Sequence, residues 1–134
     1  MTQVIIHATE NGNVAVTIPT GELPIEAVLA KDCPKGAMIV EQSALPNQYN
    51  DFFDAWELAD GKVTVSLAKA TELTKKRLRA EREPLFAAQD VLFQRAQEAN
   101  ADTTAIVAEK QRLRDVTKLA DAQTTLEGLR AIKV

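Results

Sequence analysis

The feature that most constrains the fold of this chain is a change in residue texture at Ser66. From Ser66 to Ala99 there is no glycine, and the segment is rich in Ala, Leu, Glu, Lys, Arg and Gln, which are strong helix formers. The five glycines of the chain occur singly, and each except Gly128 stands at a predicted turn. The sequence therefore predicts a first part built from short elements and a second part that is mostly helical.

Short apolar runs separated by turn residues predict a β-rich unit over residues 1–65. Val4–Ile6 and the alternating segment Val14–Ile18 are predicted strands, joined by an Asn-Gly pair that favours a tight hairpin turn. A second hairpin is predicted over Trp56–Val65, where an Asp-Gly pair marks the turn. Three further elements are expected: a short helix over Ile25–Ala30, a strand over Met38–Val40, and a short helix or extended segment over Asp51–Ala55.

The helical part is predicted to contain a long helix with Ser66 as its N-cap, followed by a turn and a second helix over Thr103–Leu119. Pro84 lies within the long run and predicts either one bent helix or two abutting helices. Asp102 is the predicted N-cap of the second helix, and the short connection favours an antiparallel helical hairpin. A last short helix is expected to be capped by Thr124 or Thr125.

Apolar side chains at three- and four-residue spacing predict which helix faces are apolar. In the long helix they are Leu67, Ala70, Leu73, Leu85, Ala88, Leu92, Ala96 and Ala99. In the second helix the inner stripe is predicted to be Ile106, Leu113 and Val116. Such a stripe is thin for a long helix, which favours coverage by a neighbour, including a second copy of the chain.

The fold class that follows is α+β, with a small antiparallel β-rich subdomain over residues 1–65 and a helical subdomain over residues 66–134. The charge balance changes at the same place. Residues 1–65 hold nine acidic and three basic side chains, whereas residues 66–134 hold ten acidic and thirteen basic ones. The asymmetry suggests that the two parts face different surroundings or different surfaces of a partner.

The composition also bears on where the protein is made. A single cysteine, Cys33, permits no disulfide within the chain and suits a reducing compartment. The first residues have neither a basic stretch nor a long apolar run, and no segment approaches the roughly 20 apolar residues needed to span a bilayer. We therefore expect a soluble protein made in the cytosol, with no membrane association.

Residues that could support catalysis or metal binding are few. His7 is the only histidine and has no partner at a recognisable metal-ligand spacing, and Cys33 has no base linked to it in the sequence. Neither a phosphate-binding glycine loop nor a hydrolase motif is present. The acidic pairs are more simply explained as solvated turn residues; they are Asp51 with Asp54 and Glu57 with Asp60. The sequence predicts a non-enzymatic protein without cofactor or metal.

The strongest charge feature is the segment from Lys75 to Glu83. Lys75, Arg79 and Arg82 share one helical face, so they could meet nucleic-acid phosphates or an acidic protein. Glutamates interleave with these cations, and the pairs Glu72–Lys76 and Arg79–Glu83 are expected to neutralise much of the charge. A solvated or protein-facing helix is the favoured interpretation, and nucleic-acid binding is the alternative.

Phe52, Phe53 and Trp56 form a local aromatic cluster. One interpretation places them in the core between the β unit and the long helix. The other exposes one or two of them as anchors for a partner, since aromatic side chains dominate interface hot spots. On the second interpretation the predicted partner-binding residues are Phe52, Phe53, Trp56, Lys75, Arg79 and Arg82.

The order of these motifs resembles small proteins encoded in the tail and tail-fibre modules of bacteriophages and prophages. The resemblance covers roughly residues 25–130, and its end is similar to the end of tail-fibre assembly proteins. The segments that carry it are Ala30–Gly36, Ala55–Glu57, Asp60–Val63, Leu67–Ala70, Lys76–Leu85, Asp90 and Glu109–Thr117, of which Leu113–Thr117 is the part similar to the assembly proteins. These motifs are structural rather than chemical.

The resemblance implies a setting, namely phage tail morphogenesis or the virion itself. It implies a tail or tail-fibre polypeptide as partner, with the protein in the host cytoplasm during assembly and on the virion tail if it is retained. Many fibre-assembly proteins carry a tryptophan-rich stretch before the Leu-Arg segment, whereas this chain has an alanine-rich helical hairpin there. Assembly factor and minor virion component are therefore both open, and a nucleic-acid-associated phage accessory factor is the alternative.

Overall fold

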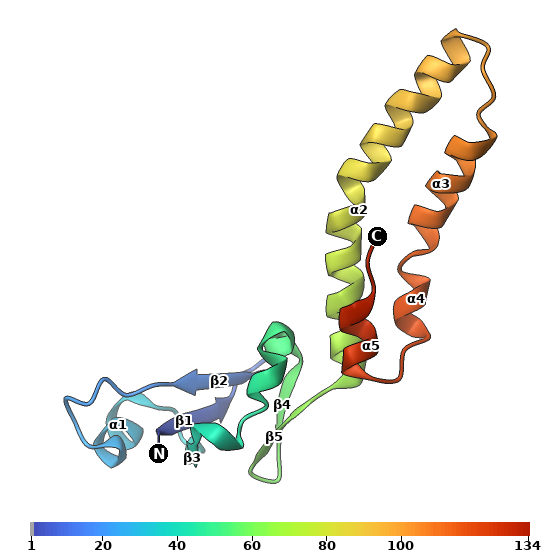
Figure 1. Cartoon of the computed structure of the whole chain (residues 1–134). Coiled ribbons are helices and arrows are strands. Elements are labelled where there is room, and N and C mark those ends of the chain that lie inside the picture. Colours follow the sequence, from blue (N-terminus) through green and yellow to red (C-terminus); the bar gives the residue numbers. More distant parts are fainter. Residues whose placement is uncertain (1) are drawn as a thin grey trace. The chain divides into compact units, whose positions relative to one another are not determined.

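A computed structural model describes residues 2–134, and the chain divides after Ala70 into two compact units. The fold class is α+β, as the sequence predicts, with small antiparallel sheets followed by a long helix and further short helices (Figure 1). In chain order the elements are β1 (Gln3–Ala8), β2 (Val14–Thr17), α1 (Ile25–Asp32), β3 (Met38–Glu41), η1 (Gln42–Ala44), η2 (Asn47–Ala55), β4 (Trp56–Ala59), β5 (Lys62–Val65), α2 (Leu67–Glu98), α3 (Thr104–Asp115), α4 (Lys118–Asp121) and α5 (Leu126–Ala131).

The first unit is built on a three-stranded antiparallel sheet in the order β2-β1-β3. Strand β1 pairs with both neighbours, so that Ile6 lies opposite Val16 on one side and opposite Met38 on the other. Both predicted hairpins are present, because β4 and β5 pair as a separate two-stranded sheet. The central strand is buried on both faces, which explains why its apolar residues Val4–Ile6 form a continuous run rather than an alternating one.

The two hairpin turns differ in a way that the Asn-Gly and Asp-Gly pairs did not reveal. At Asp60-Gly61 both residues have positive φ, 51° and 76°, as a two-residue type I′ turn requires. In the first hairpin only Gly12 has positive φ (80°), and the amide of Thr9 donates to the Asn13 carbonyl at 2.8 Å. That loop therefore has three residues, a tight turn followed by a left-handed glycine, and Asn11 does not take the positive φ expected of the Asn-Gly pair.

The core of the first unit lies between the three-stranded sheet and the β4–β5 hairpin. Its buried cluster consists of Val4, Ile6, Val14, Leu45 and Trp56. The Trp56 indole Nε1 donates to a backbone carbonyl, that of Tyr49, at 3.1 Å, which satisfies the one polar atom of this buried ring. Helix α1 contacts β1 and β3.

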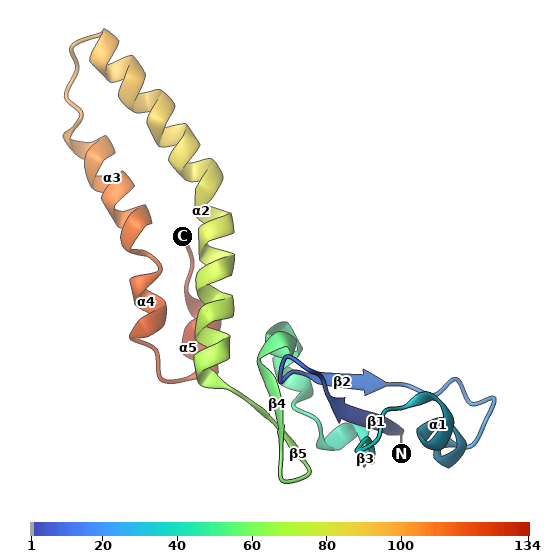
Figure 2. The ribbon, with the colours of Figure 1, turned by 180° about the vertical axis from the view of Figure 1, so that it is seen from behind.

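The second unit begins within α2, which continues without a break through Pro84. Figures 1 and 2 both show that α2 changes direction near its middle. A proline inside a helix lacks one amide donor and crowds the preceding turn, so a bend at this position is expected. Of the two possibilities that the sequence left open, the structure has the single bent helix.

The ends of α2 follow local capping rules. The side-chain Oγ of Ser66 accepts from the Lys69 amide at 3.2 Å, which confirms the predicted N-cap. At the other end Asn100 adopts a φ of 53°, and the Ala101 amide donates to the Ala96 carbonyl at 2.8 Å. This is a Schellman ending, in which asparagine takes the left-handed position usually held by glycine.

The second predicted helix is wrong in length, because it is divided in two. Helix α3 ends at Asp115, and α4 starts at Lys118 after a turn at Val116 and Thr117. Thr125 is the cap of α5, since its side-chain Oγ1 accepts from the Gly128 amide at 3.0 Å. The predicted inner residues Leu113 and Val116 are buried.

Burial within the second unit is uneven along α2. Figures 1 and 2 show α5 and the C-terminal segment beside the first half of α2. Leu78, Leu113 and Leu129 are fully buried. From Arg79 to Arg112, by contrast, every residue is exposed or half-buried, because this end of the hairpin consists of two helices only.

The predicted apolar face of α2 is therefore only partly correct. In the second half of the helix, Phe86 and Phe93 are half-buried, whereas Leu85 and Leu92 are 39% and 45% exposed. The Lys110 ammonium of α3 lies 5.1 Å from the centre of the Phe93 ring and 2.6 Å from Asp90 Oδ1, which shows the face of α2 that α3 covers. The leucines lie outside that face.

Candidate protein-binding surfaces

The aromatic cluster contributes one residue to the surface, where the sequence led us to expect one or two. Phe52 and Trp56 are buried at 6% and 2% exposure, whereas Phe53 is 38% exposed and its ring centre lies 4.9 Å from that of Trp56. Phe52 and Trp56 cannot contact a partner while the first unit is folded. Of the three aromatic anchors predicted from the sequence, Phe53 alone remains available.

Lys75 is occupied inside the helical unit. Its Nζ lies 2.6 Å from Asp121 Oδ1 of α4 and 3.5 Å from Glu72 Oε1, and its side chain is only 17% exposed. The hydrogen bond to Asp121 raises the pKa of the Lys75 ammonium above its ordinary value. The expectation that Lys75 points outward toward a partner is therefore wrong, because the lysine ties α2 to α4.

Arg82 also faces inward. Its guanidinium donates to the backbone carbonyls of Leu113 and Arg114, both at 3.1 Å, and lies 5.5 Å from the centre of the Phe86 ring. These carbonyls belong to the last turn of α3, where the helix lacks partners of its own and carries partial negative charge. Arg82 thus caps α3 at the point where the predicted second helix divides.

Arg77 has the same role for α5, and its place in the basic segment did not indicate this role. The guanidinium donates to the Ile132 carbonyl at 2.9 Å and to the Leu129 carbonyl at 3.4 Å. It also pairs with Glu81 at 3.1 Å. Only the folding of α5 back onto α2 makes these carbonyls reachable, so a search for charged rows along the sequence could not have found this role.

The remaining cation of the predicted row, Arg79, is exposed. The predicted helical pairs are also replaced, since Glu72 pairs with Lys75 and Glu81 pairs with Arg77. Most of the basic segment of α2 therefore holds the helical unit together. The nucleic-acid alternative needs the predicted row of Lys75, Arg79 and Arg82 to face outward, and in the structure only Arg79 of the three does so.

The other titratable candidates lie apart from one another. His7 is half-buried in β1, and its Nδ1 atom has no hydrogen-bond partner among the described residues. Cys33 is a half-buried free thiol at the end of α1. Within residues 2–134 no group of three or more His, Cys, Asp or Glu side chains is arranged to hold a metal ion. No helix of this range has the length and apolar character to cross a membrane.

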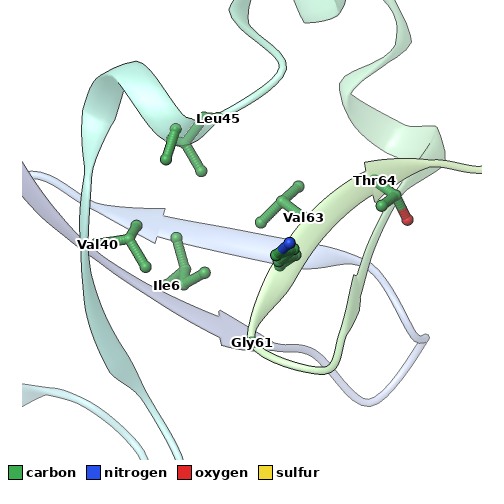
Figure 3. A pocket seen from close by; sticks show the side chains of 8 residues that line it. Ile6, Val40, Leu45, Gly61, Val63 and Thr64 are labelled. Carbon is green, nitrogen blue, oxygen red and sulfur yellow. The ribbon is translucent and has the colours of Figure 1, made fainter.

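An apolar pocket of about 240 Å³ lies in the first unit and was not foreseen from the sequence. Figure 3 shows Ile6, Val40, Leu45 and Val63 pointing into it from β1, β3, the segment after η1, and β5. Lys62 is the only charged residue in its lining, which contains no carboxylate, imidazole or thiol. The lining suits contact with an apolar group.

The pocket adjoins two strands that each have one side without a strand neighbour. Strand β3 is at the edge of the three-stranded sheet, and β5 pairs only with β4. Such edges present backbone amides and carbonyls that an extended segment of another chain can pair with. The apolar residues of these strands were visible in the sequence, but the meeting of β3 and β5 at one pocket depends on how the two sheets pack.

Comparison of this chain with protein-family models, with curated proteins and with solved structures gave no match. The similarity to phage tail-module proteins thus stays a prediction from the motifs.

Proposed function

We propose that this chain is a non-enzymatic protein of a bacteriophage tail module that binds a tail or tail-fibre polypeptide. It acts as an assembly factor or stays on the virion as a minor structural component. The phage setting rests on the resemblance of the motifs. Binding rather than catalysis is supported by one observation above others, the apolar pocket between Val40 of β3 and Val63 of β5.

The size and lining of the pocket favour a side chain of a partner protein over a free small molecule. Pockets for drug-sized ligands usually measure about 300 to 1,000 Å³ and place several polar groups around the ligand. This pocket is smaller, at about 240 Å³, and mostly apolar. One apolar side chain of a partner segment would fill much of it and would be removed from water there.

The adjoining strand edges supply the second part of the proposed contact. An extended partner segment would pair its backbone with β3 or β5 and place one apolar side chain in the pocket. Backbone pairing provides affinity without sequence preference, and the pocket provides the selectivity. The exposed ring of Phe53 is a further apolar contact of this unit.

The nucleic-acid alternative has less support. Phosphate binding needs several free cations on one face, whereas Lys75 and Arg82 are engaged within the helical unit. We expect no salt-dependent mobility shift with DNA at low ionic strength. A shift abolished by Arg79→Glu would favour the alternative over the tail-binding proposal.

The proposal is tested by blocking the pocket from its rim. Ala44 lines the pocket and is exposed, so Ala44→Trp fills the opening without removing a core side chain. Tagged wild-type protein, Ala44→Trp and the matched control Ala44→Ser are expressed in cells producing the phage, and copurifying proteins and purified particles are examined by mass spectrometry. Wild type and Ala44→Ser should recover the same tail or fibre polypeptide, and Ala44→Trp should lose it.

Circular dichroism of the three proteins provides the control for folding. Equal recovery by a folded Ala44→Trp variant would exclude the pocket as the binding site. If deletion of the gene left both particles and fibres normal, the proposed tail-module function would be contradicted. Turnover of a small molecule by the purified protein would contradict its non-enzymatic character.

A further inference from the structure

The second half of α2 carries a row of exposed residues that the hairpin does not cover. Leu85 and Leu92 are 39% and 45% exposed, and Ala88 between them is exposed as well. Glu81 precedes these residues and Arg95 follows them, and both are exposed. We call these five residues, Glu81, Leu85, Ala88, Leu92 and Arg95, the distal stripe.

Helix geometry places the distal stripe on one face. Its members are separated by four, three, four and three residues, the spacing that keeps side chains aligned along a helix and that coiled coils use for their contact seam. The half-buried residues Phe86 and Phe93, which follow the leucines by one position, lie about 100° further around the helix. The stripe is therefore separate from the face that α3 covers.

The stripe is complementary to itself when two copies run antiparallel. With Ala88 opposite Ala88 of the second copy, Glu81 falls opposite Arg95, and Leu85 lies one residue, about 1.5 Å along the helix axis, from the level of Leu92 of the second copy. A two-fold contact must pair residue i with j and j with i. Glu81 and Arg95 meet that requirement because each lies seven residues from Ala88, whereas the leucines, three and four residues from Ala88, interdigitate instead of facing each other directly. The small side chain at the centre lets the helices approach closely, and the antiparallel orientation also aligns the helix dipoles favourably.

We propose that the protein self-associates by antiparallel pairing of two distal stripes about Ala88. Glu81 and Arg95 stand at opposite ends of the apolar row, so parallel pairing would place like charges together, whereas antiparallel pairing joins opposite charges. The complementary charges of Glu81 and Arg95, each seven residues from Ala88, are why a second copy is the occupant. The inference is independent of the tail-binding proposal, since it uses a different unit of the chain.

The first test is the oligomeric state of the whole protein. Sedimentation equilibrium of the wild type over increasing concentration should show the mean mass rising toward twice that of the monomer. Leu92→Glu places a charge beside Leu85 of the second copy and should weaken association about ten-fold or more. The matched control is Val107→Glu, because Val107 is 48% exposed but lies on α3 and not on the stripe. A wild type that stays monomeric, or equal weakening by both substitutions, would overturn the proposal.

A second test fixes the register. In a Cys33→Ser background, Ala88→Cys should form a disulfide-linked dimer when oxidised with copper–phenanthroline, because the two-fold axis brings the two thiols together. Ala87→Cys is the control at the neighbouring exposed alanine. Faster cross-linking at position 87 than at 88 would contradict the register.

The third test examines the charge pairing. Glu81→Lys and Arg95→Glu should each weaken the dimer, and the double variant should restore most of the wild-type association. Helical content measured by circular dichroism verifies that each variant is folded, including Glu81→Lys, which also loses the pair with Arg77. A double variant as weak as the singles would exclude antiparallel pairing of Glu81 with Arg95.

Discussion

The two units of this chain reach stability by different means. In the first unit, apolar side chains bury both faces of β1, and Trp56 closes the cluster with its indole hydrogen bond satisfied. In the helical unit, full burial is confined to the first half of the hairpin, and arginines bond to the carbonyl ends of α3 and α5. The comparison shows that a chain with only 4% aromatic residues can hold a helical hairpin with few buried side chains, but leaves apolar surface uncovered.

The largest expected effect is in the core of the first unit. Trp56→Ala removes its largest fully buried side chain and should destabilise that unit by about 3 to 5 kcal/mol. Urea unfolding gives the magnitude, and amide hydrogen exchange should show faster exchange in β1. Phe53→Ala, at an exposed ring beside it, should cost about 1 kcal/mol or less. Equal losses for the two variants would contradict the assignment of Trp56 to the core.

The same contrast applies within the helical unit. Leu78 is fully buried and Leu92 is 45% exposed, so Leu78→Ala should cost about 2 to 5 kcal/mol and Leu92→Ala about 0.5 kcal/mol. Both are measured by thermal and urea unfolding at protein concentrations low enough to keep the chain monomeric. A comparable cost at both positions would mean that the distal half is packed more tightly than its exposure indicates.

The capping arginines should have intermediate effects. Arg82→Met retains much of the side-chain packing but leaves the Leu113 and Arg114 carbonyls without this donor, at a cost of about 2 kcal/mol. Arg77→Met should behave similarly for α5. Arg79→Met, at an exposed arginine of the same helix, should change stability by no more than about 0.5 kcal/mol. If Arg79→Met were the most destabilising of the three substitutions, the assignment of Arg77 and Arg82 as the arginines that stabilise the helical unit would be contradicted.

The smallest effect concerns the start of α3. The Asp102 carboxylate accepts from the Thr104 hydroxyl at 2.7 Å and from the Thr104 amide at 3.0 Å, and these bonds lower the pKa of Asp102 below its ordinary value of 3.8. A carboxyl with a lowered pKa in the folded state stabilises that state above pH 3.8, and the contribution is lost as the pH falls through the lowered pKa.

NMR titration of Asp102 should therefore give a midpoint below 3.8, with α3 fraying from its first turn as the carboxyl is protonated. The N-cap residue of α3 is Thr103 and not the predicted Asp102, because the helix begins at Thr104. Asp102→Asn keeps a side-chain acceptor for Thr104 at every pH, whereas Asp102→Ala should lose it. A midpoint at or above the ordinary value would contradict the hydrogen bonding described for Thr104.

Elements with local signals could be predicted well from the sequence. The Asp-Gly turn, the Ser66 cap and the cap of α5 all act within a few residues, so neighbouring side chains suffice to specify them. The division of α3 from α4 could not be predicted, because the Leu113 and Arg114 carbonyls accept from Arg82, about 30 residues earlier. The candidate site shows the same limit. The spacing of Lys75 and Arg82 predicted that they share one helix face, but it could not show whether that face points to solvent or to the other helices.

What the sequence determined by itself was the order and type of the elements, and the change from a β-rich to a helical part near Ser66, since periodicity, turn residues and helix propensity are local properties. Tertiary structure alone decided which faces were covered. It buried Trp56, turned the basic segment of α2 toward the ends of α3, α4 and α5, and brought β3 and β5 together at one pocket. Tertiary structure also left the distal stripe exposed, because α5 and the C-terminal segment lie beside the first half of α2 only.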